Sequence, residues 1–258
     1  MLTGTHVSFL LWITPASRAQ PHTVNRERTP IQPNSYGAAM TELSVSQVNR
    51  AGKRVRRHAR GEDVDSEALR LAFDILVAYR TAHARSLQTA TMGLRSAVET
   101  MGYPIRVSQR LKRVPTIIDK LKREPTLALS RMQDIGGSRA VLPDLRAVRA
   151  VQERLTTRDS RARSLRRVDD YIANPRFSGY RGVHIVMQYN GRDIELQLRT
   201  PLMHVWALET ERLLDIFGLD FKAGWNQNVN PFLALVSYAL AVEEAGGSVP
   251  VSLKREID

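Results

Sequence analysis

Cysteine is absent from this 258-residue chain. The chain therefore cannot form disulfides, bind zinc through thiolates or use a cysteine nucleophile, and its composition is compatible with the cytosol. Its length allows one large domain with added helices or two small domains, and either arrangement can bury a sizeable core.

Long hydrophobic runs are also lacking. The apolar run at residues 7–13 is far shorter than the roughly 20 residues that a membrane-spanning helix needs. No basic residue precedes this run, which argues against a secretory signal even though Ser17-Arg18-Ala19 resembles a cleavage site. We therefore expect a cytoplasmic protein with no membrane partner.

Acidic residues are outnumbered by basic ones. The chain has 26 Asp and Glu residues against 38 Lys and Arg residues, which gives a formal net charge of +12. This balance favours polyanionic partners such as RNA or nucleotides. Two dense basic blocks either are solvated surface or bind RNA phosphates, and the pattern leaves both interpretations open. The blocks are residues 53–60 and the group Arg158, Arg161, Arg163, Arg166 and Arg167.

Composition and periodicity divide the chain into four parts. Residues 1–39 predict a disordered extension, or a misassigned start if translation begins at Met40. Residues 40–101 predict a helical N-terminal segment that contains the first basic block. An α/β domain is expected at residues 102–217, and a C-terminal helical tail at residues 218–258.

Proline positions and apolar spacing predict individual elements within these parts. Apolar residues recur at helical spacing from residue 66 to residue 101, in a helix that extends through or breaks around His83. Pro115 in a first turn and Pro125 beyond the end bound a short helix. The chain then changes to mixed α/β. Further elements are a buried strand at Arg139–Leu142 and helices at Ala147–Leu155, Leu202–Glu211 and Val229–Glu244. The last helix either packs on the domain, which we favour, or binds a partner.

Asn190-Gly191 marks a β-hairpin. This dipeptide between the alternating runs 183–189 and 192–199 is the strongest short-range hairpin signal. A two-residue loop sets the register and pairs Ile185 with Leu196, so that one face of the hairpin is apolar. The other face is polar and is either a solvated sheet face or one wall of a cleft. It carries His184, Gln188, Asp193, Glu195, Gln197 and Arg199.

Cations, a carboxylate and a tyrosine stand near these elements. Arg110, Lys112 and Lys120, at the start of the short helix and one turn into it, either hold nucleotide phosphates or face solvent. Asp134 lies just before a strand whose glycines let another group approach the backbone, and the alternative is an ordinary turn. Tyr180, in the turn-rich loop before the hairpin, either stacks on a base or packs in the core.

In the order and spacing of these residues, the chain resembles the synthetase domain of RelA/SpoT homologues. Four motifs carry the resemblance, and Thr116 replaces the serine of the first motif while keeping its hydroxyl group. Arg110, Lys112, Thr116 and Lys120 match R-x-K-x-x-x-S-x-x-x-K; Asp134 and Arg139 match D-x-x-x-x-R; Asp170, Tyr171, Ile172, Pro175, Gly179, Tyr180 and His184 match D-Y-I-x-x-P-x-x-x-G-Y-x-x-x-H; and Glu195, Gln197, Arg199 and Thr200 match E-x-Q-x-R-T.

The resemblance implies a nucleotidyltransferase-like α/β fold, with a mixed sheet and flanking helices. It also implies a pyrophosphokinase that transfers the β,γ-pyrophosphate of ATP to a ribose 3′-hydroxyl. Asp134 and Glu195 would be the catalytic residues and would bind Mg²⁺, the implied cofactor. ATP would be bound by Arg110, Lys112, Thr116, Lys120 and Arg139, and the acceptor by Tyr180, His184, Gln197 and Arg199.

The motifs do not fix the acceptor. The residues in and around the motifs are most similar to those of the toxic small synthetases of toxin–antitoxin systems. This resemblance implies the 3′-terminal adenosine of tRNA as acceptor, inhibition of translation, and a separate antitoxin protein. The alternative is a (p)ppGpp synthetase of the stringent response, with GDP or GTP as acceptor. A catalytically idle RNA-binding module is a third reading, which the presence of both Asp134 and Glu195 disfavours. The oligomeric state stays open.

Overall fold

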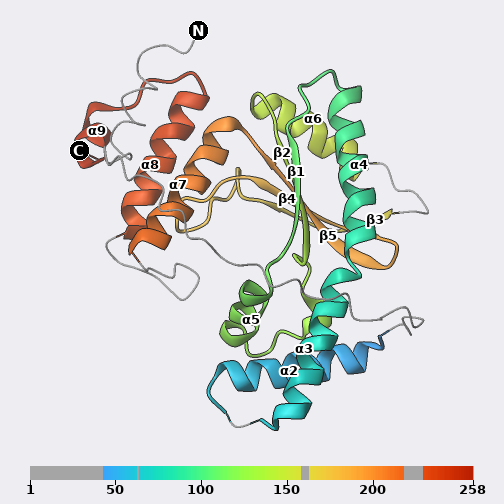
Figure 1. The fold of residues 1–258 in the computed structure, drawn as a ribbon. Coiled ribbons are helices and arrows are strands. Elements are labelled where there is room, and N and C mark those ends of the chain that lie inside the picture. Colours follow the sequence, from blue (N-terminus) through green and yellow to red (C-terminus); the bar gives the residue numbers. More distant parts are fainter. Residues whose placement is uncertain (1–42, 63, 158–162, 218–228, 258) are drawn as a thin grey trace, which may run out of the picture. The chain divides into compact units, whose positions relative to one another are not determined.

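The computed structural model describes residues 43–62, 64–157, 163–217 and 229–257 (Figure 1). The predicted extension at residues 1–39 and the alternative start at Met40 lie outside the described residues. Arg158 and Arg161 of the second basic block lie outside them as well.

A five-stranded mixed sheet forms the centre of the described part (Figure 1). The strand order is β1-β2-β5-β4-β3. Strand β2 is parallel to β5, and the other neighbouring pairs are antiparallel. The fold prediction is therefore confirmed at the level of a mixed α/β sheet with flanking helices. The strands are β1 (Val107–Leu111), β2 (Gly136–Val141), β3 (Arg163–Asp170), β4 (Val183–Tyr189) and β5 (Arg192–Arg199).

The predicted hairpin is confirmed in both position and register. Ile185 pairs with Leu196, and the two strands are joined by Asn190-Gly191. Both loop residues have positive φ, 49° and 76°, as the tight turn of a two-residue hairpin requires. The register therefore places Glu195 on the polar face of the sheet.

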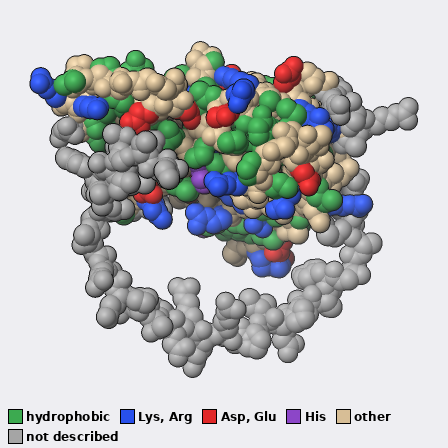
Figure 2. Space-filling model, turned by 90° about the horizontal axis from the view of Figure 1, so that it is seen from above, with side chains coloured by type: hydrophobic (Ala, Val, Ile, Leu, Met, Phe, Trp, Pro, Cys, Tyr) green, Lys and Arg blue, Asp and Glu red, His purple; other side chains and the backbone are tan. Residues whose placement is uncertain are grey.

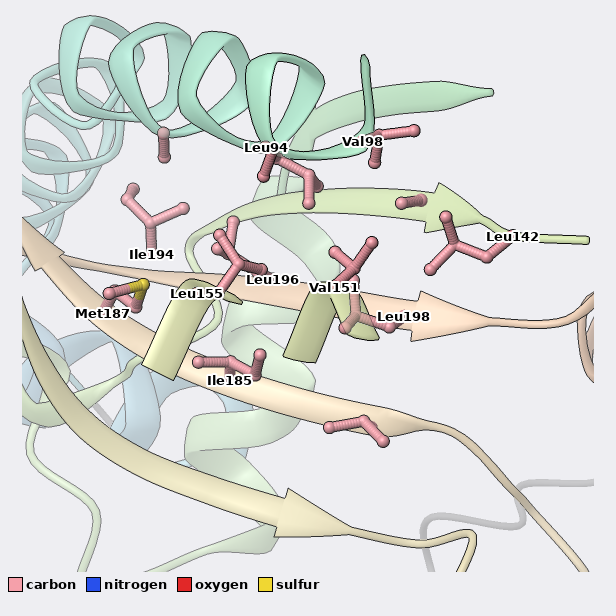
Figure 3. Packing of buried hydrophobic residues seen from close by; sticks show 14 of the residues in the cluster. Leu94, Val98, Leu142, Val151, Leu155, Ile185, Met187, Ile194, Leu196 and Leu198 are labelled. Carbon is pink, nitrogen blue, oxygen red and sulfur yellow. The ribbon is translucent and has the colours of Figure 1, made fainter. Parts of the chain in front are cut away.

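Helices α4 (Ala84–Thr100) and α6 (Leu145–Thr156) cover the apolar face of the sheet. Figure 3 shows Leu94 and Val98 of α4 and Val151 and Leu155 of α6 pointing toward the apolar side chains of the strands. Burying this face leaves the opposite, polar face available for a site. The strand side chains in this core include Ile185, Met187, Ile194, Leu196 and Leu198.

The N-terminal half is helical, as predicted. Helix α3 (Ser66–Thr81) ends just before His83, and α4 starts after it, so the chain does break there. A second core joins helix α2 (Val45–Ala59), α3 and α5 (Val114–Arg123) with the short 3-10 helix η1 (Leu129–Arg131). This core supports α5, the predicted short helix with proline in its first turn.

Three helices follow the sheet: α7 (Pro201–Phe217), α8 (Val229–Glu244) and α9 (Val251–Ile257). The first two confirm the predicted helices after the hairpin, and α9 lies within the predicted helical tail, although it was not predicted as a separate helix. Among the described residues, no helix has the length and apolar character required to cross a membrane.

Candidate active site

Asp134 is held between two lysines. It lies just before β2, where Lys112 Nζ is 2.8 Å from its Oδ2 and Lys120 Nζ is 3.1 Å from its Oδ1. Burial acts to raise the pKa of Asp134, but Lys112 and Lys120 outweigh it and hold the pKa below the ordinary value. Asp134 is therefore an ionised carboxylate at neutral pH, with two ammonium groups beside it.

Glu195 forms the second charged centre of the site. His184 Nδ1 is 3.0 Å from its Oε1, and Gln197 Nε2 donates to its Oε2 at 2.7 Å. Burial acts to raise the pKa of Glu195, and the hydrogen bonds and charge of the neighbouring His184 bring it below the ordinary value. Glu195 is thus an oriented, ionised carboxylate that is almost removed from solvent.

The two glycines before Arg139 serve different ends. A Cβ at Gly136 would lie 2.6 Å from Ile194 Cδ1, so this glycine allows the apolar face to pack. Gly137 pairs with Glu195 across the parallel strands, and a Cβ there would meet only the Glu195 carbonyl oxygen, at 3.8 Å. Gly137 therefore leaves space on the polar face beside the carboxylate, as the sequence suggested.

Tyr180 belongs to a hydrogen-bonded network on the same face. Its hydroxyl contacts His184 Nε2 at 2.5 Å and accepts from Arg199 Nη2 at 2.9 Å. Gln197 Oε1 accepts from both Arg199, at 3.3 Å, and Arg139, at 3.2 Å. Burial raises the pKa of Tyr180, against the opposing effect of Arg199. The network links the tyrosine to Glu195 through His184.

Two of the predicted ATP-binding residues lie apart from these contacts. Arg110 is exposed on edge strand β1, and not at a helix start as the sequence was interpreted. Thr116 is partly exposed in the first turn of α5. Arg110 nevertheless stands two residues before Lys112, and Thr116 lies on the same helix as Lys120.

Three neighbours of this site were not predicted as site residues, although one of them, Tyr171, belongs to the third motif. The Tyr171 ring lies 5.2 Å from His184, and the Arg176 guanidinium lies 4.4 Å from the Tyr171 ring. His204, in the first turn of α7, has a buried Nδ1 that finds no hydrogen-bond partner in the part of the chain that the structure describes. Its pKa is lowered by burial and by the charges of Arg139 and Arg199. The four-residue step from Thr200 to His204 is one helical turn and was the available signal.

The basic blocks are partly structural. Arg56 donates to backbone carbonyls at the end of α5, Arg57 pairs with Glu62 at 2.7 Å, and Arg167 pairs with Asp169 at 2.9 Å. The second block lies largely on edge strand β3, a strand that its polar sequence did not predict. Figure 2 shows other Lys and Arg side chains gathered beside a histidine on the drawn face.

The carboxylates of Asp134 and Glu195 are ligands of the type that Mg²⁺ prefers. Mg²⁺ is commonly bound by one or two protein carboxylates together with substrate phosphates and water. Asp134 and Glu195 supply two carboxylates, whose charges are close enough to influence each other. Among the described residues there is no cluster of three or more His, Asp or Glu side chains that would hold a metal alone. The site therefore fits a metal that arrives with the nucleotide.

Part of the chain matches a known protein family. A family described as "Region found in RelA / SpoT proteins" matches residues 109–213, which contain all the contacts of Asp134, Glu195 and Tyr180 given above. The GTP pyrophosphokinase YjbM of Bacillus subtilis (strain 168) is 34% identical over 147 residues, which cover 51% of this chain and 67% of that protein. The chain belongs to the RelA/SpoT family.

Other proteins match over smaller shares of their length. The GTP pyrophosphokinase of Escherichia coli (strain K12) is 33% identical over 122 residues, 43% of this chain and 15% of that protein. The uncharacterized protein Rv1366 of Mycobacterium tuberculosis is 33% identical over 118 residues, 45% of this chain and 42% of that protein.

A solved structure agrees in fold. The small alarmone synthetase 1 of Bacillus subtilis, in a crystal structure with its product pppGpp, superposes with a TM-score of 0.54 at 27% identity, over 71% of this chain and 95% of that chain. Family membership and this likeness make the protein a pyrophosphotransferase enzyme.

Proposed function

We propose that the protein transfers the β,γ-pyrophosphate of ATP to a ribose 3′-hydroxyl of a tRNA acceptor. The observation that carries the transfer chemistry is the placement of two ionised carboxylates, one between lysines and one beside a histidine, at neighbouring strands of one sheet face. Phosphoryl-type transfer depends on positioning and on neutralisation of charge, and it needs little covalent help from the protein.

Lysines and arginines form the ATP side. Lys112 and Lys120 pair with Asp134, and Arg139 lies on β2, the strand that begins just after Asp134. Ammonium groups beside a carboxylate can exchange that partner for phosphate oxygens when a nucleotide binds. With Arg110 and Thr116 at the rim, this cluster would hold the triphosphate of ATP.

Asp134 and Glu195 would hold Mg²⁺ at this site. The ion would neutralise charge on the phosphates when ATP is bound. Glu195 also faces His184, and the Glu195 carboxylate would accept the proton of the attacking 3′-hydroxyl while AMP leaves, because this carboxylate is ionised and is oriented by His184 before substrate arrives. Tyr180 would bind the acceptor base, with His184, Gln197 and Arg199 around the reacting group.

Three features support tRNA as acceptor. The net charge of +12 suits a polyanion. Lys53 and Arg54 are exposed on α2, and Arg176 and Phe177 are exposed on the loop that carries Tyr180. Exposed arginine and aromatic side chains beside a base-stacking tyrosine are typical of sites that bind single-stranded nucleic acid. On this proposal the protein is a cytoplasmic toxin that blocks translation and is neutralised by a separate antitoxin.

A guanosine nucleotide is the second candidate acceptor, which would make the protein a (p)ppGpp synthetase. It is favoured by the relatives, because the Bacillus subtilis and Escherichia coli proteins are named GTP pyrophosphokinases and the solved relative was crystallised with pppGpp. With either acceptor, residues 102–217 would form the synthetase domain, and residues 40–101 and 218–258 would flank it.

One assay separates the acceptors. Purified protein is incubated with Mg²⁺ and γ-labelled ATP, in parallel with deacylated tRNA and with GDP plus GTP. Label on intact tRNA is the expected result. Deacylated tRNA whose terminal 2′,3′-diol has been oxidised with periodate to a dialdehyde lacks the 3′-hydroxyl, serves as the control and should stay unlabelled. Label on a guanosine nucleotide alone would replace the tRNA proposal with the second candidate.

A further inference from the structure

Helix α8 lies beyond the region that matches the family, residues 109–213, yet it contacts the loop that carries Tyr180. Ser237, on the buried side of α8, donates a hydrogen bond from Oγ to the Gly179 carbonyl oxygen at 2.5 Å. This bond joins residues 58 positions apart and fixes the backbone immediately before the tyrosine.

Gly179 rests directly on the backbone of α8. Its φ of 84° is in the left-handed region that favours glycine. A Cβ at this position would lie 2.8 Å from both Ala234 Cα and Leu233 O, atoms that cannot move without moving the helix. The loop and the helix are therefore in backbone contact, and only glycine permits it.

The residue after Tyr180 is anchored to the same helix. Arg181 Nη1 lies 3.2 Å from Glu244 Oε2, and the two side chains are only 11% and 7% exposed. Among the described residues, Glu244 Oε2 has no hydrogen-bond partner, and Arg181 is the cation paired with it. Removing one partner of a buried pair leaves the other charge uncompensated, which is strongly unfavourable.

A third contact involves Trp206 of α7. Its indole Nε1 donates to the Leu233 carbonyl oxygen of α8 at 3.1 Å, and its ring lies 6.4 Å from the Tyr180 ring. The ring of Tyr180 thus lies beside a tryptophan that α8 holds in place. Helix α8 thus contacts the residues before and after the tyrosine directly, and it holds the tryptophan beside the tyrosine through one hydrogen bond.

We propose that α8 is a positioning element of the acceptor site, with Ser237 and Glu244 as positioning residues for Tyr180. The inference rests on the proposed function in one respect, the binding of the acceptor base by Tyr180. The ATP-side residues come from the segments around β1, β2 and α5, and not from the loop that α8 holds. Loosening α8 should therefore weaken acceptor binding selectively.

Steady-state kinetics of Ser237→Ala and Glu244→Gln test the selectivity, with deacylated tRNA and GTP used in turn as acceptor. Loss of one buried hydrogen bond or ion-pair partner should raise the KM for the active acceptor by about tenfold or more. The KM for ATP should stay within about twofold of wild type, because the donor contacts are untouched. Tyr238→Ala, at an α8 position that is 60% exposed, is the matched control and should change neither value.

Exchange of the charged pair separates positioning from a general loss of folding. Arg181→Glu and Glu244→Arg should each raise the acceptor KM, and the double variant should recover at least part of the loss. A double variant no better than the worse single variant would overturn the pairing. Equal effects on the ATP and acceptor KM values in all α8 variants would overturn the selective role.

Tyr180→Ala makes failure of the inference distinguishable from failure of the proposed function. If Tyr180→Ala raises the acceptor KM and the α8 variants do not, the positioning role of α8 is wrong while the acceptor site stands. If Tyr180→Ala leaves the acceptor KM unchanged, both the assignment of Tyr180 and the inference built on it are wrong.

Discussion

Arg56 places its guanidinium against the end of α5. It donates to the carbonyl oxygens of Leu121, at 2.9 Å, and of Pro125 and Leu127. Burial and the charge of Arg60 lower the pKa of Arg56. This cation therefore satisfies backbone acceptors around the helix that carries Lys120, although it stands within a block that the sequence left open as an RNA contact.

Arg56→Leu should destabilise the protein by about 2 kcal/mol, because three carbonyl oxygens lose a charged donor. Arg54→Leu, two positions away on the exposed side of α2, should change stability by less than about 0.5 kcal/mol. Denaturant unfolding at neutral pH compares the two variants. Equal stabilities would show that the Arg56 contacts do not stabilise α5.

His83 makes stability depend on pH. It is 2% exposed at the break between α3 and α4, and its Nδ1 lies 2.9 Å from the Tyr79 carbonyl oxygen. Burial is the main cause that lowers its pKa from 6.5 to about 4. The folded protein thus prefers the neutral ring, so the contribution of His83 to stability is complete above pH 6.5 and is lost as the pH falls toward 4.

We expect wild type to lose about 3 kcal/mol more than His83→Gln between pH 7 and pH 4, since each pKa unit corresponds to about 1.4 kcal/mol. The difference between the two proteins isolates His83 from the carboxylates that titrate in the same range. Urea unfolding at several pH values measures it. Parallel stability curves for the two proteins would contradict the buried neutral histidine.

At the scale of elements, two glycines should respond in opposite ways to the same change. Gly191→Ala should cost about 1 kcal/mol, because alanine is strained at φ 76° in the hairpin turn. Gly93→Ala, inside α4, should stabilise by about 0.5–1 kcal/mol, because its Cβ would find only the Tyr189 hydroxyl at 3.8 Å. Thermal unfolding of both variants gives the signs. A shift in the same direction for both would contradict these backbone assignments.

The hairpin was predictable from sequence because its signals are local. An Asn-Gly turn and strict alternation fix position and register without reference to distant residues. The edge strands β1 and β3 were not predictable in this way. β3 reads RSLRRVDD, with little apolar alternation, and it forms because β4 offers it a partner. Pairing with a strand elsewhere in the chain is a tertiary effect that local propensity does not report.

The charged core of the site was predictable for a different reason. Asp134, Glu195, Tyr180 and His184 fall in motifs whose spacing is set by the strands around them. The contact between Ser237 of α8 and Gly179 and the contact between Arg56 and Leu121 were not predictable, because each joins residues more than 50 positions apart that share no motif. Which cation in a basic block turns inward depends on what the fold places beside it.

For the whole molecule, the net charge of +12 predicts that the activity on tRNA depends on salt concentration. If tRNA is the acceptor, its kcat/KM should fall steeply with NaCl, because binding releases counterions from the RNA. Lys53→Ala combined with Arg54→Ala should make the slope of log kcat/KM against log NaCl concentration less steep by about one to two, because about one to two phosphate contacts are lost. The kinetics with GTP, a smaller anion, should change less. A flat salt response with tRNA would contradict an extended RNA contact.

We propose that Asp134 and Glu195 carry out the pyrophosphate transfer. Following AMP release together with movement of γ-label from ATP to the acceptor tests this proposal. Asp193→Asn is the matched control on the same strand as Glu195, because Asp193 binds Gln133 at 3.2 Å and lies outside the proposed machinery. We expect wild type and Asp193→Asn to transfer label with matching AMP release, and Asp134→Asn and Glu195→Gln to lose at least about a hundredfold in rate while remaining folded. Full transfer by Asp134→Asn or by Glu195→Gln would show that the substituted carboxylate is not needed for the reaction.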